Sequence, residues 1–325
     1  MPKTVLVTGA AGFIGSHLTE ALLRRGDTVV GLDSFNDYYS PTRKRQNLAE
    51  VKAAVPASAP FRFVEGDVRD RELLDRVFGA EPIDAVAHLA AMPGVRASLE
   101  KPKLYFDVNL GGTLELLEQA RQHRPTSFVL ASTSSVYGAS ERIPYVETDS
   151  CDRPLAPYPA SKRAAELLAH SYHHAHGLPV TALRFFTVYG PRGRPDMMPY
   201  RILAHLLLGE DLALYAHGKM LRDWTYVGDI VSGILAAIDR PLGYELINLG
   251  RGQPVAVADF IAEVERQTGK HARLRDEQAP ATDMNFTHAD LTKAKALLGY
   301  APSVSVDEGI RRFCRWFREV VLEEA

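Results

Sequence analysis

Cysteine is almost absent from this chain, with only Cys151 and Cys314 among 325 residues. Neither belongs to a metal-binding or redox spacing, and two thiols are too few for a disulfide framework. The sequence therefore favours ordinary thiols in a reducing compartment over a disulfide-linked secreted scaffold. We expect no metal cofactor and a cytoplasmic location.

An excess of charge of one sign is also missing. The formal net charge is −2, and basic and acidic residues are interspersed. This excludes a basic stripe for nucleic acid and a polybasic membrane patch. No apolar run reaches membrane-spanning length, and the first residues enter a strand pattern directly, so we expect neither a membrane span nor a signal peptide. There is no internal repeat and no low-complexity tract.

What the chain does contain is apolar residues, 46% of the total, in short runs that alternate with helical patterns. This alternation predicts an α/β fold, a Rossmann-type doubly wound parallel sheet with helices on both faces. The main predicted helices cover residues 110–123 and 158–176. The predicted strands cover residues 4–8, 28–33, 61–65, 85–89, 128–132 and 180–185.

The pattern loosens after Gly190, where the prolines and glycine of 191–199 predict a loop. Beyond it we expect a smaller, mixed α/β substrate-binding lobe made of residues 190–222 and 254–325. Residues 1–189 form the predicted dinucleotide-binding domain, and 223–253 are expected to return to it. The elements predicted after Gly190 are helices at 201–208, 227–238, 256–268, 290–298 and 306–321, and strands at 212–215 and 244–249.

Three glycines, Gly9, Gly12 and Gly15, join the first predicted strand to the first helix. Glycine permits a tight turn and a close backbone approach, and the helix N-terminus offers unpaired N–H groups to a pyrophosphate. The spacing is G-x-x-G-x-x-G, so a plain strand–helix turn is the alternative. The strand, turn and helix context favours the phosphate cradle.

Acidic side chains follow the next two strands. Asp33 ends the second strand, where a carboxylate binds both hydroxyls of the adenosine ribose and repels a 2′-phosphate, which favours NAD over NADP. A solvated loop aspartate is the alternative. Asp67 follows the third strand and is expected near the adenine. Small residues after His88 would let the cofactor pass.

Tyr158 and Lys162 stand one helical turn apart in Y-P-A-S-K. Positions i and i+4 share a helix face, so the ammonium can lie near the phenol oxygen. A cation there favours the phenolate and moves its pKa from about 10 toward the working range. Such a pair occurs by chance on many surface helices, and here the dinucleotide site upstream gives it meaning as a base for proton and hydride transfer.

Six motifs taken together resemble those of an extended short-chain dehydrogenase/reductase. They are G-A-A-G-F-I-G, D-V-R-D, H-L-A-A, S-V-Y-G, Y-P-A-S-K and R-F-F-T-V-Y-G-P. R-D-W-T-Y-V-G-D-I fits its nucleotide-sugar epimerase branch. F-N-D-Y-Y-S-P and G-R-P-D-M are most similar to UDP-glucuronate 4-epimerases. Arg192 and Met92 depart from that pattern, which has tryptophan and glutamine there, and both are expected near the sugar pocket.

The resemblance implies a tightly held NAD and a catalytic trio of Thr133, Tyr158 and Lys162. Tyr158 would take the 4-hydroxyl proton, Lys162 would lower the tyrosine pKa and hold the nicotinamide ribose, and Thr133 would bond the 4-oxygen. Tyr158 and Lys162 are thereby also cofactor contacts. The other expected cofactor contacts are Gly9, Gly12, Phe13, Ile14, Gly15, Asp33, Asp67, Val68, Leu89, Ala90, Ala91 and Asn109.

The resemblance also directs the assignment of substrate contacts. A 4-keto glucuronate is a β-keto acid that loses CO₂ unless its carboxylate is restrained. Arg194 is our hypothesis for the charge partner, and Ser134, Ser135 and Thr187 for the hydroxyl contacts of the carboxylate. Thr133 is a substrate contact through the 4-oxygen. Arg222 is the expected diphosphate ligand, with Asp283 and, more weakly, Arg96 beside it. A solvated surface charge is the alternative for each arginine.

Ser135 narrows the reaction. Related decarboxylases and dehydratases carry an acidic residue at this position, and this chain does not. The expected reaction is therefore NAD-dependent epimerisation of UDP-glucuronate to UDP-galacturonate without decarboxylation. The alternatives are a 4-epimerase of UDP-glucose or UDP-N-acetylhexosamine, a UDP-glucuronate decarboxylase and a non-catalytic NAD-binding sensor.

Two further expectations concern the helices at 110–123 and 158–176. Family members dimerise through two such helices per subunit, so a homodimer is expected. His170, His173 and His174 have a spacing that could hold a metal, but a surface helix face is the favoured interpretation.

Overall fold

The computed structural model describes residues 1–278, 282–284 and 286–322. At its centre is a seven-stranded sheet in the order β11-β6-β5-β4-β1-β2-β3, and all neighbouring strands are parallel. This confirms the predicted Rossmann-type sheet. Its strands are β1 (Thr4–Thr8), β2 (Thr28–Asp33), β3 (Phe61–Glu65), β4 (Ala85–His88), β5 (Ser127–Thr133), β6 (Val180–Phe185) and β11 (Tyr244–Leu249).

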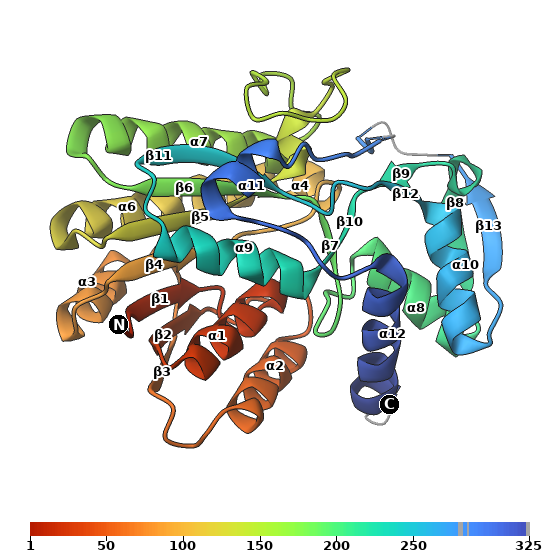
Figure 1. Ribbon diagram of the computed structural model, residues 1–325, viewed down its shortest axis with the longest axis horizontal. Helices are drawn as coiled ribbons and strands as arrows, with labels where there is room; N and C mark the ends of the chain where they lie inside the picture. The colour runs from red at the N-terminus through yellow and green to blue at the C-terminus, as the bar shows by residue number, and fades with distance from the viewer. Residues whose placement is uncertain (279–281, 285, 323–325) are drawn as a thin grey trace.

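Helices cover both faces of this sheet because successive strand residues point to opposite sides. In β1, Val5 and Val7 pack in one apolar cluster with α1 and α9, while Leu6 packs in another with α3, α6 and α7. Figure 1 shows these two layers. The helices are α1 (Phe13–Arg25), α2 (Pro41–Ala54), α3 (Arg71–Ala80), α6 (Gly112–His123), α7 (Pro157–His176) and α9 (Val227–Asp239).

The strand order reverses between β1 and β4, which lie side by side while their following strands diverge. In such sheets, ligands bind in the crevice beyond the carboxyl ends of the strands at this point. The connection after β4 runs through α4 (Ala97–Glu100), α5 (Pro102–Phe106) and a π-helical turn at Asp107–Gly111 before α6 begins. The helix predicted at 110–123 is therefore a π turn followed by an α-helix.

Most of the remaining elements lie on the right of Figure 1. Two-stranded pairings join β7 to β10, β9 to β12 and β8 to β13. These elements are β7 (Thr187–Tyr189), α8 (Met198–Leu208), β8 (Asp211–Tyr215), β9 (Leu221–Arg222), β10 (Trp224–Tyr226), β12 (Val255–Ala256), α10 (Val257–Thr268), β13 (Arg273–Glu277), α11 (Thr292–Leu298) and α12 (Val306–Trp316).

Two predictions in this part need correction. The loop expected at 191–199 ends earlier, because α8 already begins at Met198 and accommodates Pro199 in its first turn, where proline loses no hydrogen bond. The helix expected at 306–321 is α-helical only to Trp316 and then continues as a π turn, Phe317–Leu322.

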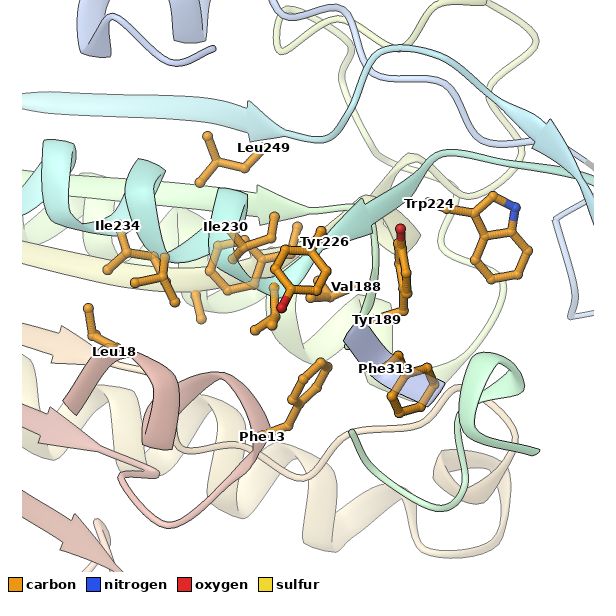
Figure 2. Packing of buried hydrophobic residues seen from close by; sticks show 14 of the residues in the cluster. Phe13, Leu18, Val188, Tyr189, Trp224, Tyr226, Ile230, Ile234, Leu249 and Phe313 are labelled. Carbon is orange, nitrogen blue, oxygen red and sulfur yellow. The ribbon is translucent and has the colours of Figure 1, made fainter. Parts of the chain in front are cut away.

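One apolar cluster connects the sheet to the C-terminal elements. Figure 2 shows Phe13 of α1, Ile230 of α9 and Phe313 of α12 facing the same core. Trp224 of β10 is fully buried and stacks on Phe260 of α10 at 4.3 Å.

β11 joins the sheet beside β6, in line with the expected return of 223–253. The domain boundaries themselves stay a prediction.

Both cysteines are buried free thiols. Across residues 1–278, 282–284 and 286–322, no helix combines the length and the apolar character needed to cross a bilayer. In the same residues, no group of histidine, cysteine, aspartate and glutamate side chains has an arrangement that could hold a metal ion.

Candidate active site

The glycine turn between β1 and α1 is packed too closely for any side chain. Gly9 has a φ of +71°, and a Cβ on it would lie 2.9 Å from the backbone nitrogen of Ala90. A Cβ on Gly15 would lie 2.0 Å from the Gly9 oxygen. α1 begins after Gly12, which has no side chain to cap the first N–H groups. These N–H groups stay available to a pyrophosphate, as the sequence predicts.

Asp33 is held rigidly at the end of β2. Its two carboxylate oxygens accept hydrogen bonds from the N–H groups of Ala11, at 3.1 Å, and Phe35, at 2.9 Å. Burial raises its pKa, and those N–H groups together with the Lys44 charge oppose the rise. Each oxygen keeps a lone pair for a further donor, so the carboxylate suits the two hydroxyls of an unphosphorylated ribose, the group that distinguishes NAD from NADP.

A cavity of about 380 Å³ runs from the glycine turn to α7. It brings together most of the expected cofactor contacts with both residues of the tyrosine–lysine pair. The site residues from the sequence that line it are Gly9, Gly12, Phe13, Ile14, Gly15, Asp33, Asp67, Val68, Leu89, Ala90, Ala91, Tyr158, Lys162 and Arg194. The close-packed glycines and the Asp33 carboxylate in one cavity fit a bound NAD.

Several residues of this cavity were not singled out from the sequence, among them Asp37, Tyr38 and Lys44. All three follow β2. Asp37 and Tyr38 belong to F-N-D-Y-Y-S-P, which was used only for the family resemblance, and Lys44 lies just beyond it. Lys44 donates to the backbone oxygen and the side-chain oxygen of Asn36 at 2.7 and 2.8 Å.

Asp67 lies on the cavity wall in an ion pair with Arg69. Hydrogen bonds from the Arg69 guanidinium hold the pKa of Asp67 below its usual range. Asn109 is buried and does not line the cavity. Its side chain bonds both backbone groups of Met92 and the Ser161 hydroxyl, at 2.7 to 3.0 Å. Asn109 thus fixes the segment after β4 against α7, and its role as a cofactor contact stays a prediction.

Tyr158 and Lys162 lie in the first turns of α7, with both side chains directed into the cavity. Burial lowers the pKa of Lys162 to about 8, against the opposing charge of Glu166. Burial also raises the pKa of Tyr158, while the Arg194 guanidinium and a hydrogen bond with Thr133 lower it. The Tyr158 ring packs edge-on against Tyr105 at 6.2 Å.

The Arg194 guanidinium is a cation near Tyr158 that the sequence analysis did not assign to this role. Its charge opposes the effect of burial on the Tyr158 pKa. The same effect, assigned to Lys162 from the sequence, stays a prediction. Arg194 keeps its charge in an ion pair with Asp196.

The hydroxyl residues expected at the sugar gather where β5 and β6 end. Thr133 lies opposite Phe185 in the β5–β6 register, and Thr187 begins β7 two residues after Phe185. The Thr133 hydroxyl donates to the Ser135 hydroxyl and accepts from the Ser135 N–H, both at 3.2 Å. Ser134 starts the 3₁₀ turn that follows. None of these four lines the large cavity, but Thr133 reaches Tyr158 through the hydrogen bond above.

Arg96, Arg222 and Asp283 also converge, although they come from three distant segments. The Arg96 guanidinium binds the Asp283 carboxylate at 2.7 and 3.3 Å and lies 4.9 Å over the Tyr215 ring. Burial lowers the pKa of Arg222, and the Asp283 charge opposes this. This cluster is separate from the residues lining the large cavity.

Met92 and Arg192, which depart from the family pattern, lie in different surroundings. Met92 lies on the cavity wall. Arg192 does not line this cavity. Its side chain turns toward α1 and α2, where it binds Glu20 at 2.8 Å and Glu50 at 2.9 Å. Its backbone is left-handed, with a φ of +59°, so Arg192 and Arg194 extend in different directions from one loop.

Two of the α7 histidines that were expected on a surface helix face pack against neighbouring residues. The His170 ring meets Tyr244 edge-on at 4.8 Å, and Nδ1 of His173 bonds the Leu178 oxygen at 2.8 Å. These contacts pack the C-terminal end of α7 against β11 at the edge of the sheet and against the segment before β6.

Comparison with known proteins places this site in a class. The chain belongs to the NAD dependent epimerase/dehydratase family, whose model matches residues 5–250. It is 43% identical to the UDP-glucuronate 4-epimerase of Thermodesulfobacterium geofontis over 97% of this chain and 96% of that protein. The crystal structure of UDP-glucuronic acid 4-epimerase from Bacillus cereus with UDP-glucuronic acid and NAD has a TM-score of 0.90.

That crystal structure shares 36% identity over 98% of this chain and 99% of its own. A UDP-glucose 4-epimerase of Thermotoga maritima, solved with UDP-glucose, is also similar, with 29% identity and a TM-score of 0.88 over 98% and 99% of the two chains. The relatives thus share the fold of this chain but include proteins with different sugars.

Proposed function

We propose that this protein is an NAD-dependent UDP-glucuronate 4-epimerase that produces UDP-galacturonate without loss of CO₂. The observation that carries the proposal is the placement of Arg194 in the same cavity as Tyr158 and Lys162. A neutral sugar needs only the tyrosine and lysine, whereas a uronate also needs a cation at its carboxylate. The relatives named as UDP-glucuronate 4-epimerases support the same substrate.

Tyr158 is the base that takes the proton from the sugar 4-hydroxyl. When bound, NAD supplies a reversible acceptor for the hydride on C4. Thr133 shares a hydrogen bond with the Tyr158 oxygen and stabilises the charge that develops on the sugar 4-oxygen. After the 4-keto ring has turned its other face to the cavity, C4 takes the hydride back on that face and Tyr158 returns the proton to the 4-oxygen. The 4-hydroxyl then has the opposite configuration.

Lys162 and the glycine turn bind the cofactor. The lysine is buried, so a hydrogen bond from its ammonium to a ribose hydroxyl is protected from water. Gly9, Gly12, Phe13, Ile14 and Gly15 hold the pyrophosphate, and Asp33 holds the adenosine ribose. Asp67, Val68, Leu89, Ala90 and Ala91 form the walls of the cavity.

Restraint of the carboxylate is the second task of the site. Decarboxylation of the 4-keto sugar requires the carboxylate bond to align with the carbonyl π system. Arg194, together with the hydroxyls of Ser134, Ser135 and Thr187, holds the carboxylate out of that alignment. The Ser135 hydroxyl is hydrogen-bonded to Thr133, and it provides no acid or base for a step after oxidation.

The nucleotide diphosphate lies outside the large cavity in this proposal. Arg222 binds its oxygens, and Arg96 and Asp283 position that end of the substrate. The Arg96–Asp283 ion pair bridges the segment after β4 and the segment before α11. Substrate binding would therefore connect the sheet with the C-terminal elements.

We also propose a cytoplasmic homodimer formed through α6 and α7. Large apolar side chains on this part of the surface are exposed, with Leu114 of α6 at 38% and Leu167 of α7 at 56%. A four-helix contact would cover both. The division into an NAD-binding domain, 1–189 with 223–253, and a sugar-binding lobe, 190–222 with 254–325, belongs to the same proposal.

One incubation tests the reaction. Wild-type protein is mixed with UDP-glucuronate, and the products are separated by chromatography, with Tyr158→Phe as the matched control. UDP-galacturonate from the wild type alone is the expected result. UDP-xylose or UDP-arabinose would indicate a decarboxylase. Turnover of UDP-glucose or UDP-N-acetylhexosamine but not of the uronate would favour those epimerases, and no turnover with any of them would favour a sensor.

A further inference from the structure

Asp196 forms a two-point ion pair with Arg194, two residues earlier in the loop between β7 and α8. Nε of Arg194 lies 3.0 Å from Oδ1, and Nη2 lies 3.1 Å from Oδ2. The carboxylate therefore occupies the Nε–Nη2 edge of the planar guanidinium. The Nη1 edge is left for a second carboxylate.

Tyr38 holds this pair from the opposite side of the cavity. Its hydroxyl donates to Oδ2 of Asp196 at 3.0 Å, and its ring lies 5.8 Å from the Arg194 guanidinium carbon. Gly94 makes the approach possible, because a Cβ there would lie 2.2 Å from the Tyr38 hydroxyl. Three segments of the chain thus fix the geometry of Arg194.

Asp196 is ionised in this setting. Burial favours its protonated form, but the Arg194 guanidinium and the hydrogen bonds from Arg194 and Tyr38 outweigh burial and hold the pKa below its usual range. Arg194 therefore faces the reacting end of the cavity with its charge already balanced by a carboxylate of the protein.

We infer that Asp196 is a specificity-determining residue that shares Arg194 with the carboxylate of the substrate. The inference rests on the proposed function. A uronate on the free Nη1 edge keeps its hydrogen bonds, but the nearby Asp196 charge reduces its net attraction to the site. The ring must turn over between the two hydride steps, so the carboxylate contacts have to loosen and form again. Sharing of Arg194 lowers the cost of that movement, whereas an uncompensated guanidinium would hold one pose.

The test separates the charge of Asp196 from its structural support. Dissociation constants are measured by calorimetry in the Tyr158→Phe background, with and without Asp196→Asn, for UDP-glucuronate and for UDP-glucose. The substitution should tighten UDP-glucuronate by about tenfold and leave UDP-glucose within about twofold. With Tyr158 present, Asp196→Asn should lower both KM and kcat for UDP-glucuronate.

Two controls accompany this measurement. Asp196→Glu keeps the charge and should preserve the wild-type ratio of the two affinities. Asp211→Asn removes one negative charge from an exposed position on β8 and should change neither affinity. These controls exclude a general effect of net charge.

Weaker binding of UDP-glucuronate by Asp196→Asn would overturn the inference, because it would mean that Asp196 only supports Arg194. If the wild type still made UDP-galacturonate, the proposed function would stand. A wild type that converts no UDP-glucuronate would refute the proposed function whatever the Asp196 variants bind.

Discussion

Arg184 of β6 and Glu166 of α7 form a two-point ion pair in which both side chains are fully buried, with two N–O distances of 2.9 Å. Glu166 also accepts hydrogen bonds from Ser132 and Arg163. It lies one helical turn after Lys162, so this pair fixes α7 against the sheet next to the turn that carries Tyr158 and Lys162.

Glu166→Gln is expected to lower the free energy of unfolding by about 3 kcal/mol, because it leaves the buried Arg184 charge without a balancing carboxylate. Urea denaturation measures this value. The double variant Glu166→Met/Arg184→Met removes both charges and should recover much of the loss. Equal stability of Glu166→Gln and the wild type would contradict the importance of the pair.

Lys162 should make the stability depend on pH in an alkaline window. Its pKa is about 8 in the folded protein and about 10.5 when unfolded. Between these values the unfolded state binds more protons, so the free energy of unfolding rises with pH through this window. Below pH 8 the buried charge costs up to about 3 kcal/mol, an upper bound from the same shift.

Lys162→Met removes this titration. In the cofactor-free protein it should be more stable than the wild type at pH 7.5, and the difference should shrink by pH 10. Urea unfolding of both proteins at the two pH values gives the comparison, in which other titrating groups cancel. A difference that does not change with pH would show that Lys162 is not desolvated.

Arg194→Ala should weaken UDP-glucuronate on the order of tenfold or more and UDP-glucose much less, because only the uronate offers a carboxylate to the guanidinium. Calorimetric titration of both nucleotides measures this. Arg194→Lys keeps a charge without the planar two-edged geometry and should be intermediate. Equal weakening of the two ligands would remove Arg194 from the carboxylate site.

Arg192 should matter for stability rather than for the choice of sugar. Arg192→Met leaves Glu20 and Glu50 without their shared cation, and we expect a loss of about 2 kcal/mol in urea denaturation. Glu50→Gln added to this variant should restore part of it. A large change in the UDP-glucuronate to UDP-glucose affinity ratio, with unchanged stability, would reverse this assignment.

Much of the sheet could be predicted because its signals are local. The bounds of β1, β2, β3, β6 and β11 agree with the sequence prediction, since short apolar runs between turn residues are typical of buried parallel strands. β13 was missed because Arg273–Glu277 is exposed and largely charged. Only its pairing with β8 makes it a strand.

The sequence by itself determined the glycine turn, Asp33 and the tyrosine–lysine pair on α7, because each depends on neighbours in the chain or on a strand or helix end. Tertiary structure decided that Arg194 lies near Tyr158, and that Arg192 turns away while Arg194 enters the cavity beside Asp196 and Tyr38. The physical reason is that charge interactions and burial depend on distance in space, and in this protein the deciding partners come from segments far apart in the chain.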